Sequence, residues 1–153
     1  MGRKISLPML TCMPVGRSVF DRTFVDTFFV VALTNQHDTY HSQASRLADE
    51  YEGRPLLTTD AVLLEIGNAL ARRFKSEAIE IIDSFFSSPE VEIVRLSPEL
   101  FEQAYELYQA YRDKEWGLVD CISFVVMRQM NIHQALTFDQ HYIQAGFKAL
   151  MRL

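Results

Sequence analysis

Short apolar segments alternate with longer helical patterns along most of this 153-residue chain. Runs with the character of buried strands cover residues 19–25, 56–59, 91–96, 134–138 and 147–153. Between them the sequence predicts helices over 28–33, 42–51, 60–74, 76–86, 98–111 and 119–130. Short strands separated by helices favour a parallel sheet that is covered on both faces. We therefore expect an α/β fold, a three-layer α/β/α sandwich around a central, mostly parallel sheet.

The length and the 48% apolar content suffice for one ordinary domain, which we place at residues 19–153. Residues 1–18 are predicted to be an N-terminal extension, disordered or partly ordered, because Pro8 and Pro14 interrupt its apolar patch. No apolar run approaches the roughly 20 residues that a membrane span requires. The two cysteines, Cys12 and Cys121, form no disulfide framework. A protein of the reducing cytoplasm, without membrane attachment, is expected.

The net charge of −5 is unevenly distributed along the chain. Residues 77–115 carry ten acidic and three basic side chains, so the excess of acidic over basic residues lies in the middle third of the chain. This balance counts against a nucleic-acid-binding protein that relies on a broad basic face. It leaves open a protein that holds phosphate groups through a metal ion.

Four acidic residues lie within apolar segments, namely Asp26, Glu65, Asp120 and Asp139. Burying an isolated carboxylate is unfavourable by several kcal/mol, so each of them needs a compensating partner. Asp26 and Asp139 follow predicted strands, and ligands of such sheets bind beyond the carboxyl ends of the strands. Carboxylates gathered at this edge are typical of a magnesium site. The sequence therefore predicts one shared cation site.

Three of these acids also have a purely structural interpretation. Asp120 could cap the helix that follows it. Asp139 could be a turn residue. Glu65 could face solvent on its helix. These alternatives stay open on sequence grounds alone.

Taken in order, the acidic motifs resemble those of the PIN domain family, and within it the ribonucleases of the VapC toxin type. The matching segments are Asp26-Thr27 after a strand, Glu65-Ile-Gly-Asn68, Leu118-Val-Asp-Cys-Ile-Ser123 and Leu136-Thr-Phe-Asp139. The resemblance implies a metal-dependent endoribonuclease that hydrolyses RNA phosphodiester bonds with Mg²⁺ or Mn²⁺. It also implies a toxin that forms a homodimer and is inhibited by a small cognate antitoxin.

By the same resemblance, the four acids are the catalytic residues and the metal ligands. Thr27, Asn68 and Ser123 match positions that orient them. Two other functions are compatible with the same residues. One is a PIN-like binding module with weak or no cleavage that acts in a protein or RNA complex. The other is a structure-specific DNA nuclease of the related 5′-nuclease type, which would need a longer chain to carry its extra substrate-threading elements.

Candidate contacts with RNA phosphate are Arg72, Arg73, Lys75 and His141. The first three lie at a helix end, where cations also interact favourably with the helix dipole. His141 lies two residues beyond Asp139.

Aromatic residues at 105, 108 and 111 are interpreted as core and interface positions rather than as a platform for base stacking. Trp116 is interpreted as a packing anchor that leads into the 119–130 helix.

Overall fold

The computed structural model describes residues 22–153. The predicted extension at 1–18, and residues 19–21 of the first predicted strand, lie outside this range. The strands are β1 (Thr23–Val25), β2 (Leu56–Thr59), β3 (Val91–Val94), β4 (Gln134–Leu136) and β5 (Lys148–Ala149). The helices are α1 (Thr27–Thr34), α2 (His41–Tyr51), α3 (Asp60–Leu70), α4 (Lys75–Ser87), α5 (Pro98–Ala110), α6 (Leu118–Gln129) and α7 (Gln140–Gln144), and a 3₁₀ turn covers Leu150–Arg152.

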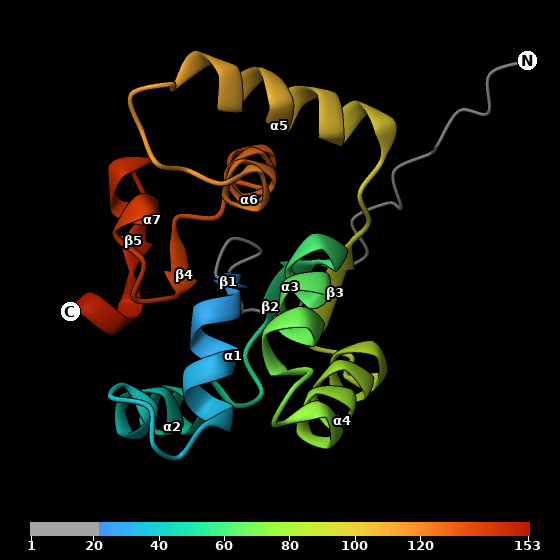
Figure 1. The fold of residues 1–153 in the computed structure, drawn as a ribbon, viewed down its shortest axis with the longest axis vertical. Helices are drawn as coiled ribbons and strands as arrows, with labels where there is room; N and C mark the ends of the chain where they lie inside the picture. The colour runs from blue at the N-terminus through green and yellow to red at the C-terminus, as the bar shows by residue number, and fades with distance from the viewer. Residues whose placement is uncertain (1–21) are drawn as a thin grey trace, which may run out of the picture.

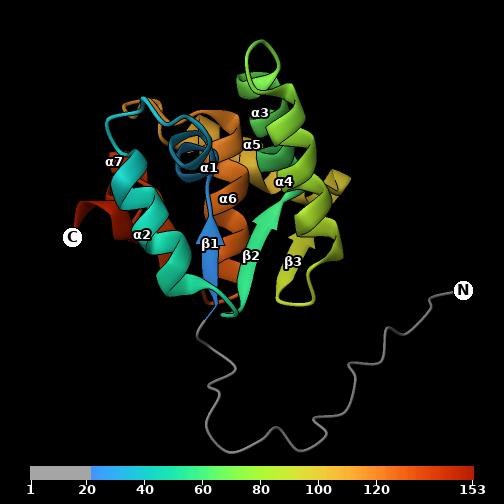
Figure 2. The same ribbon diagram turned by 90° about the horizontal axis from the view of Figure 1, so that it is seen from below.

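The five strands form one sheet in the order β3-β2-β1-β4-β5. Every neighbouring pair runs parallel, so the predicted α/β fold with a mostly parallel sheet is confirmed. Figure 2 shows β1, β2 and β3 pointing the same way, with α1 beginning where β1 ends. Parallel strands bring their carboxyl ends to one edge, and this edge carries the residues considered below.

Helices cover both faces of the sheet. Figure 1 shows α5 and α6 on one side and α1, α2 and α4 on the other. This division follows from the chain order, because right-handed crossovers place helices on opposite faces when the direction of travel across the sheet reverses. The chain moves outward from β1 to β3 and then returns to β4 and β5. The predicted three-layer sandwich is therefore observed.

The strands at the centre of the sheet are buried on both faces, as the apolar runs predict. Every residue of β1 is buried, and Phe24 and Leu57 are completely inaccessible to solvent. Phe124 and Met127 of α6 are also fully buried in the same core. Truncating one such aromatic side chain to alanine typically destabilises a protein by about 3–5 kcal/mol.

The structure corrects several predicted boundaries. The cap of α3 is Thr59, whose Oγ1 accepts a hydrogen bond from Val62 N at 3.1 Å, whereas Asp60 accepts one from Leu96 N. This helix ends at Leu70 rather than near Phe74. The predicted strand over 147–153 is reduced to the two residues of β5, since the 3₁₀ turn begins directly after it.

Helix α7 was not predicted from the sequence. Its five residues make about one and a half turns, which is too short to produce a hydrophobic period. Within residues 22–153, no helix combines the length and the apolar character needed to cross a membrane.

Candidate active site

The carboxyl edge of the sheet borders a cavity of about 300 Å³ that contains all four predicted acids. Asp26 lies between β1 and α1, Glu65 lies in the middle of α3, and Asp120 lies in the first turn of α6. Asp139 caps the N-terminus of α7. Segments that are far apart in the sequence thus place their carboxylates on one cavity. The lining residues are Asp26, Thr27, Phe28, Val31, Asp38, Glu65, Asp120 and Asp139.

Asp26 is the most deeply placed acid, with 6% of its surface exposed. The hydroxyl of Thr137 donates a hydrogen bond to its Oδ2 at 2.8 Å. Burial raises the pKa of Asp26 from 3.8 to about 7. The negative charges of Asp120 and Glu65 raise this pKa further, whereas the bond from Thr137 opposes the shift. A carboxylate in this position is stabilised in its charged form by a nearby cation.

Glu65 is half-buried, and the Oγ1 of Thr27 donates a hydrogen bond to its Oε1 at 2.8 Å. Burial also raises the pKa of Glu65, and the charge of Asp120 adds to this effect. The alternative of a solvent-facing Glu65 is therefore wrong. The side chain reaches from the wall of α3 into the cavity, and Thr27 fixes its orientation.

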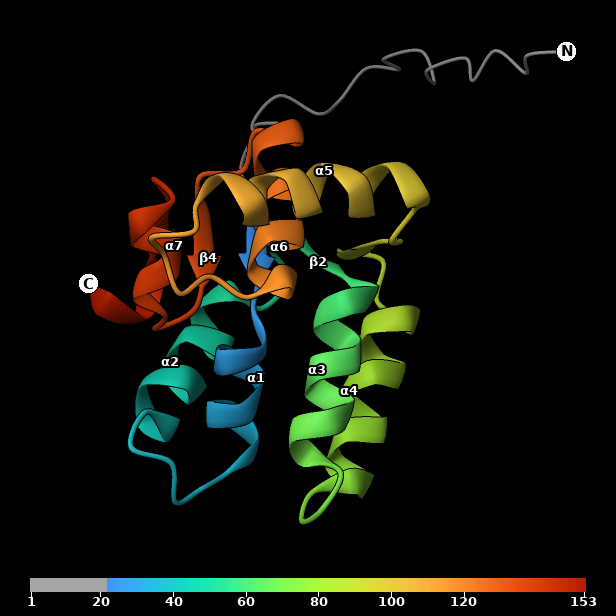
Figure 3. The same ribbon diagram turned by 45° about the horizontal axis from the view of Figure 1, so that its top comes forward.

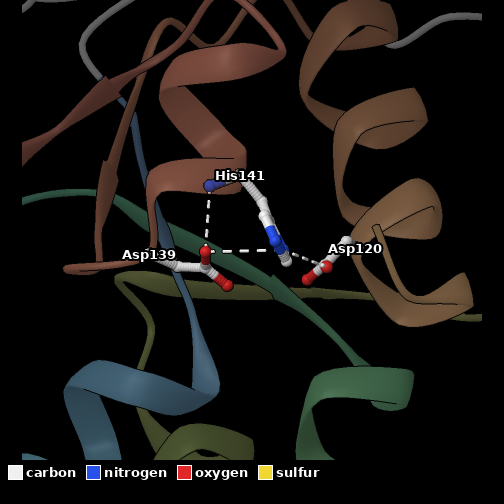
Figure 4. Close-up of side chains that lie close together, drawn as sticks. All are labelled: Asp120, Asp139 and His141. Carbon is white, nitrogen blue, oxygen red and sulfur yellow. Dashed lines mark hydrogen bonds and ion pairs between the residues drawn. The ribbon is translucent and has the colours of Figure 1, made fainter. Parts of the chain in front are cut away.

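Asp120, Asp139 and His141 converge on one point of the cavity edge (Figure 4). His141 Nδ1 lies 3.0 Å from Asp120 Oδ2 and 3.4 Å from Asp139 Oδ1. One ligand atom from each of the three residues can be chosen so that all lie within 4.8 Å of one another. This spacing is compatible with a shared metal ion.

Asp120 also stabilises the first turn of α6, in line with its structural alternative, whereas Asp139 caps helix α7 and is not merely a turn residue. Asp120 Oδ2 accepts a hydrogen bond from Gly117 N at 3.0 Å, and Asp139 Oδ1 accepts one from His141 N at 2.9 Å. Both acids therefore begin a helix and line the cavity at the same time. The capping bonds fix the carboxylates in place without neutralising them.

The negative charge of the cavity has little compensation from the protein. In the described part of the chain, neither lysine nor arginine forms an ion pair with any of the four acids, and His141 alone contacts two of them. Burial raises the pKa of Asp120 as it does for Asp26 and Glu65. Crowded carboxylates without a lysine or arginine partner are the hard oxygen donors that Mg²⁺ and Mn²⁺ prefer. The residues present fit a divalent metal ion.

Other predicted residues lie outside the cavity. Asn68 is exposed on α3 and is not among the lining residues. Ser123 is fully buried in α6, where its hydroxyl donates to Val119 O at 3.1 Å. The basic side chains of Arg72, Arg73 and Lys75 are exposed between the end of α3 and the start of α4. The α3–α4 turn that carries them projects away from the sheet (Figure 3).

Three residues near the acids were not identified from the sequence. Asp38 contributes a fifth carboxylate to the cavity, and no sequence signal distinguishes it from other polar loop residues. Thr137 orients Asp26, and the threonine two positions before Asp139 could have indicated this. Tyr142 is completely buried, and its hydroxyl makes no hydrogen bond within residues 22–153.

Comparison with known proteins agrees with this geometry. The family model described as "PIN domain" matches residues 23–148. The 23S rRNA-specific endonuclease VapC20 of Mycobacterium tuberculosis is 35% identical over 126 residues, which cover 81% of this chain and 94% of the relative.

Solved structures show the same similarity. The crystal structure of M. tuberculosis VapC20, described as a sarcin–ricin loop cleaving toxin, superposes with a TM-score of 0.74 at 34% identity, covering 82% of this chain and 95% of that one. The VapBC2 structure from Rickettsia felis, bound to a DNA fragment from its promoter, has a TM-score of 0.58 at 16% identity and covers 84% and 96% of the two chains. This second likeness concerns the fold alone. The chain belongs to the PIN domain family and, within it, to the VapC-type proteins.

Proposed function

We propose that this protein is a VapC-type toxin that hydrolyses RNA phosphodiester bonds at the acidic cavity with the help of a divalent metal ion. The observation that carries the proposal is the convergence of Asp26, Glu65, Asp120 and Asp139 on one cavity without lysine or arginine partners in the described residues. A phosphodiester is itself negatively charged, so substrate and carboxylates need a cation between them.

Asp26, Asp120 and Asp139 are the principal metal ligands in this proposal, and Glu65 holds a second ion or positions the attacking water. Bound Mg²⁺ or Mn²⁺ supplies Lewis-acid polarisation of the scissile phosphate and lowers the pKa of a water molecule. The protein's own contribution is to hold the donor atoms in place before substrate arrives. Thr137 fixes Asp26, and Thr27 fixes Glu65, each through a 2.8 Å hydrogen bond.

Apolar side chains complete the walls of the cavity. Phe28 and Val31 line it on the α1 side, and Phe28 packs against Tyr40 and Phe138 with ring centroids 5.5 and 5.8 Å away. An apolar wall lowers the local dielectric and strengthens the interaction between carboxylates and a cation. His141 can contact the substrate phosphate from the side of α7, since its ring lies at the cavity edge.

The similarity to VapC20 supports a proposal for the substrate. That relative acts on 23S rRNA and is described as cleaving the sarcin–ricin loop. We extend this to a structured RNA loop as the substrate class here, with Arg72, Arg73 and Lys75 as outer phosphate contacts. A small antitoxin as inhibitor, a homodimer and action in the bacterial cytoplasm complete the proposal.

Cleavage of a mixed RNA pool by the purified protein tests this function. We expect cleavage with Mn²⁺ or Mg²⁺, none with EDTA, and none from Asp26→Asn with the metal present. Asp83→Asn, at an exposed acid of α4 that does not line the cavity, is the matched control and should cleave RNA like the parent protein. RNA binding without cleavage at any metal concentration would favour a PIN-like binding module instead.

A further inference from the structure

A second cavity, which we call the aromatic groove, lies where α5 ends and the chain turns toward α6. Its volume is about 630 Å³, larger than that of the acidic cavity. Three tyrosines, one tryptophan and two cations contribute to its lining, namely Tyr105, Tyr108, Tyr111, Trp116, Arg112 and Lys114. The proposed catalytic chemistry uses none of them.

The tyrosines of α5 are exposed, so the interpretation of the series as core is wrong, while its interpretation as an interface stays a prediction. Tyr105 and Tyr108 are each 46% exposed, and their rings are nearly parallel, with centroids 6.4 Å apart and an angle of 18° between planes. Phe101, Tyr105 and Tyr108 follow one another on α5 at spacings of four and three residues, so these three rings form a single stripe along the helix. Arg112 lies in the turn that follows the end of α5. An exposed aromatic stripe marks a binding surface.

The acidic residues of α5 lie on another face of the helix. Glu99, Glu102 and Glu106 are spaced by three and four residues, so they form a row of their own. Helical periodicity of 100° per residue places the centres of the two rows about a third of a turn apart, with Glu102 and Tyr105, three positions apart, as the nearest pair. None of these three acids lines the groove.

The inner wall of the groove is rigid. Trp116 is 4% exposed, as the packing-anchor interpretation predicts. Its ring centroid lies 4.7 Å from that of Tyr111 and 5.1 Å from that of Phe124. Its Nε1 donates to Gln144 Oε1 at 3.0 Å, which ties the groove to α7.

The groove and the acidic cavity share one segment of chain. Gly117 lines the groove, and its backbone N–H donates to Asp120 Oδ2 in the acidic cavity. Figure 3 shows the connection from α5 passing beside α7 to the start of α6. The lining of the groove therefore adjoins that of the acidic cavity at Gly117 and Asp120.

The charges in the groove suit a phosphate backbone. Arg112 forms no ion pair within residues 22–153, and Lys114 pairs only with its neighbour Asp113 at 3.4 Å. Glu115 also lines the groove and offsets part of the positive charge there. Arg112 and Lys114 can therefore contact individual phosphates, but they do not form a broad basic face. Cations that contact phosphates beside exposed aromatic rings are the standard means of binding single-stranded RNA.

We propose that the aromatic groove binds one or two unpaired nucleotides next to the phosphate that is cleaved, with their bases against Tyr105 and Tyr108 and their phosphates near Arg112 and Lys114. This inference rests on the proposed function, because it identifies the groove as part of the same substrate site. It makes single-stranded character beside the scissile bond a requirement for tight binding.

Binding can be measured separately from cleavage. Trp116 is the only tryptophan of the chain and lines the groove, so its fluorescence reports occupancy. In an Asp26→Asn background, titration with a single-stranded oligoribonucleotide should change this fluorescence. Tyr105→Ala combined with Tyr108→Ala should weaken binding roughly ten-fold or more, since stacking on aromatic side chains contributes strongly for each base.

Phe101→Ala is the matched control, because Phe101 lies on the same stripe and is 43% exposed but does not line the groove. It should leave oligonucleotide affinity within about two-fold of the parent, as expected for an exposed side chain without a role in binding. Equal affinities of the parent and the double tyrosine variant would overturn the proposal. If the double tyrosine variant also lost a dimer in size-exclusion chromatography while its affinity stayed unchanged, the stripe would be a contact between copies of the chain.

Cleavage kinetics separate this inference from the proposed function. With Asp26 restored, the double tyrosine variant should raise KM for a substrate with an unpaired flank and leave kcat nearly unchanged. Absence of cleavage by the wild-type protein would refute the proposed function, while the fluorescence titration would still test the groove. Wild-type cleavage with an unchanged KM in the double variant would refute the groove alone.

Discussion

Thr137 and Asp26, which are 111 positions apart in the sequence, are joined by a 2.8 Å hydrogen bond between the threonine hydroxyl and Oδ2 of the acid. The same hydroxyl accepts a hydrogen bond from the backbone N–H of Asp139 at 3.0 Å. One side chain therefore fixes the position of two proposed metal ligands. The other oxygen of Asp26 remains available to a cation in the cavity.

Replacing Thr137 with valine should weaken Mn²⁺ binding by about 10- to 100-fold, because partners that orient metal ligands typically contribute this much to affinity. Isothermal titration calorimetry provides the measurement. Thr58→Val is a matched control, since Thr58 is also fully buried and its hydroxyl donates to Val25 O at 2.8 Å without contacting an acid. If both variants lost the same affinity, the effect would be a general destabilisation.

Asp26→Asn should stabilise the metal-free protein at pH 8. The folded-state pKa of Asp26, about 7, lies above its ordinary value of 3.8, so its contribution to stability is fully present at low pH and is lost as the pH rises through 7. The neutral asparagine avoids this loss and can still accept the bond from Thr137. Urea unfolding in EDTA should show a gain of several kcal/mol at pH 8 that shrinks toward zero near pH 4. A gain that is independent of pH would contradict the buried-charge interpretation.

Asp120→Asn should reduce metal-dependent cleavage by at least about a hundred-fold, as expected when a principal metal ligand is lost. The asparagine oxygen can still accept the bond from Gly117 N, so α6 should begin as before. Asp60→Asn is the control, because Asp60 also begins a helix and accepts a backbone bond but lies outside the cavity. Circular dichroism should give the same spectrum for both variants. Unfolding of Asp120→Asn alone would assign Asp120 a mainly structural role.

Divalent metal should raise the melting temperature. A metal concentration 100 times the dissociation constant stabilises the folded state by about 2.7 kcal/mol, which corresponds to roughly 5–10 °C for a chain of this size. Differential scanning fluorimetry with Mn²⁺ measures the shift. Asp120→Asn should show a much smaller one. A rise of the same size in that variant would place the bound metal elsewhere.

The fold could be predicted from the sequence because its strands are short apolar runs bounded by clear helix signals. Ser97 and Pro98 predict the start of α5, and Ser97 does cap it by accepting a bond from Leu100 N. The end of the chain was predicted less well. Residues 147–153 are apolar enough to suggest a strand, but their backbone turns into a 3₁₀ helix after two paired residues. Hydrophobicity alone does not distinguish these outcomes.

The acids of the cavity could be predicted because a carboxylate within an apolar segment is unfavourable unless it has a specific partner. The residues around the acids could not be predicted in the same way. Asn68 lies three positions after Glu65, yet its side chain is exposed outside the cavity, since positions three apart on a helix differ by about 60° in direction. Asp38 lies in a polar loop, and only the packing of that loop against α1 and Phe138 brings it to the cavity.

The most direct test of the metal site is anomalous X-ray diffraction from crystals grown with Mn²⁺. We predict a manganese peak inside the acidic cavity, within coordinating distance of carboxylate oxygens from Asp26, Asp120 and Asp139. Crystals that show manganese only at other positions, with these carboxylates bonded to protein groups alone, would contradict the account.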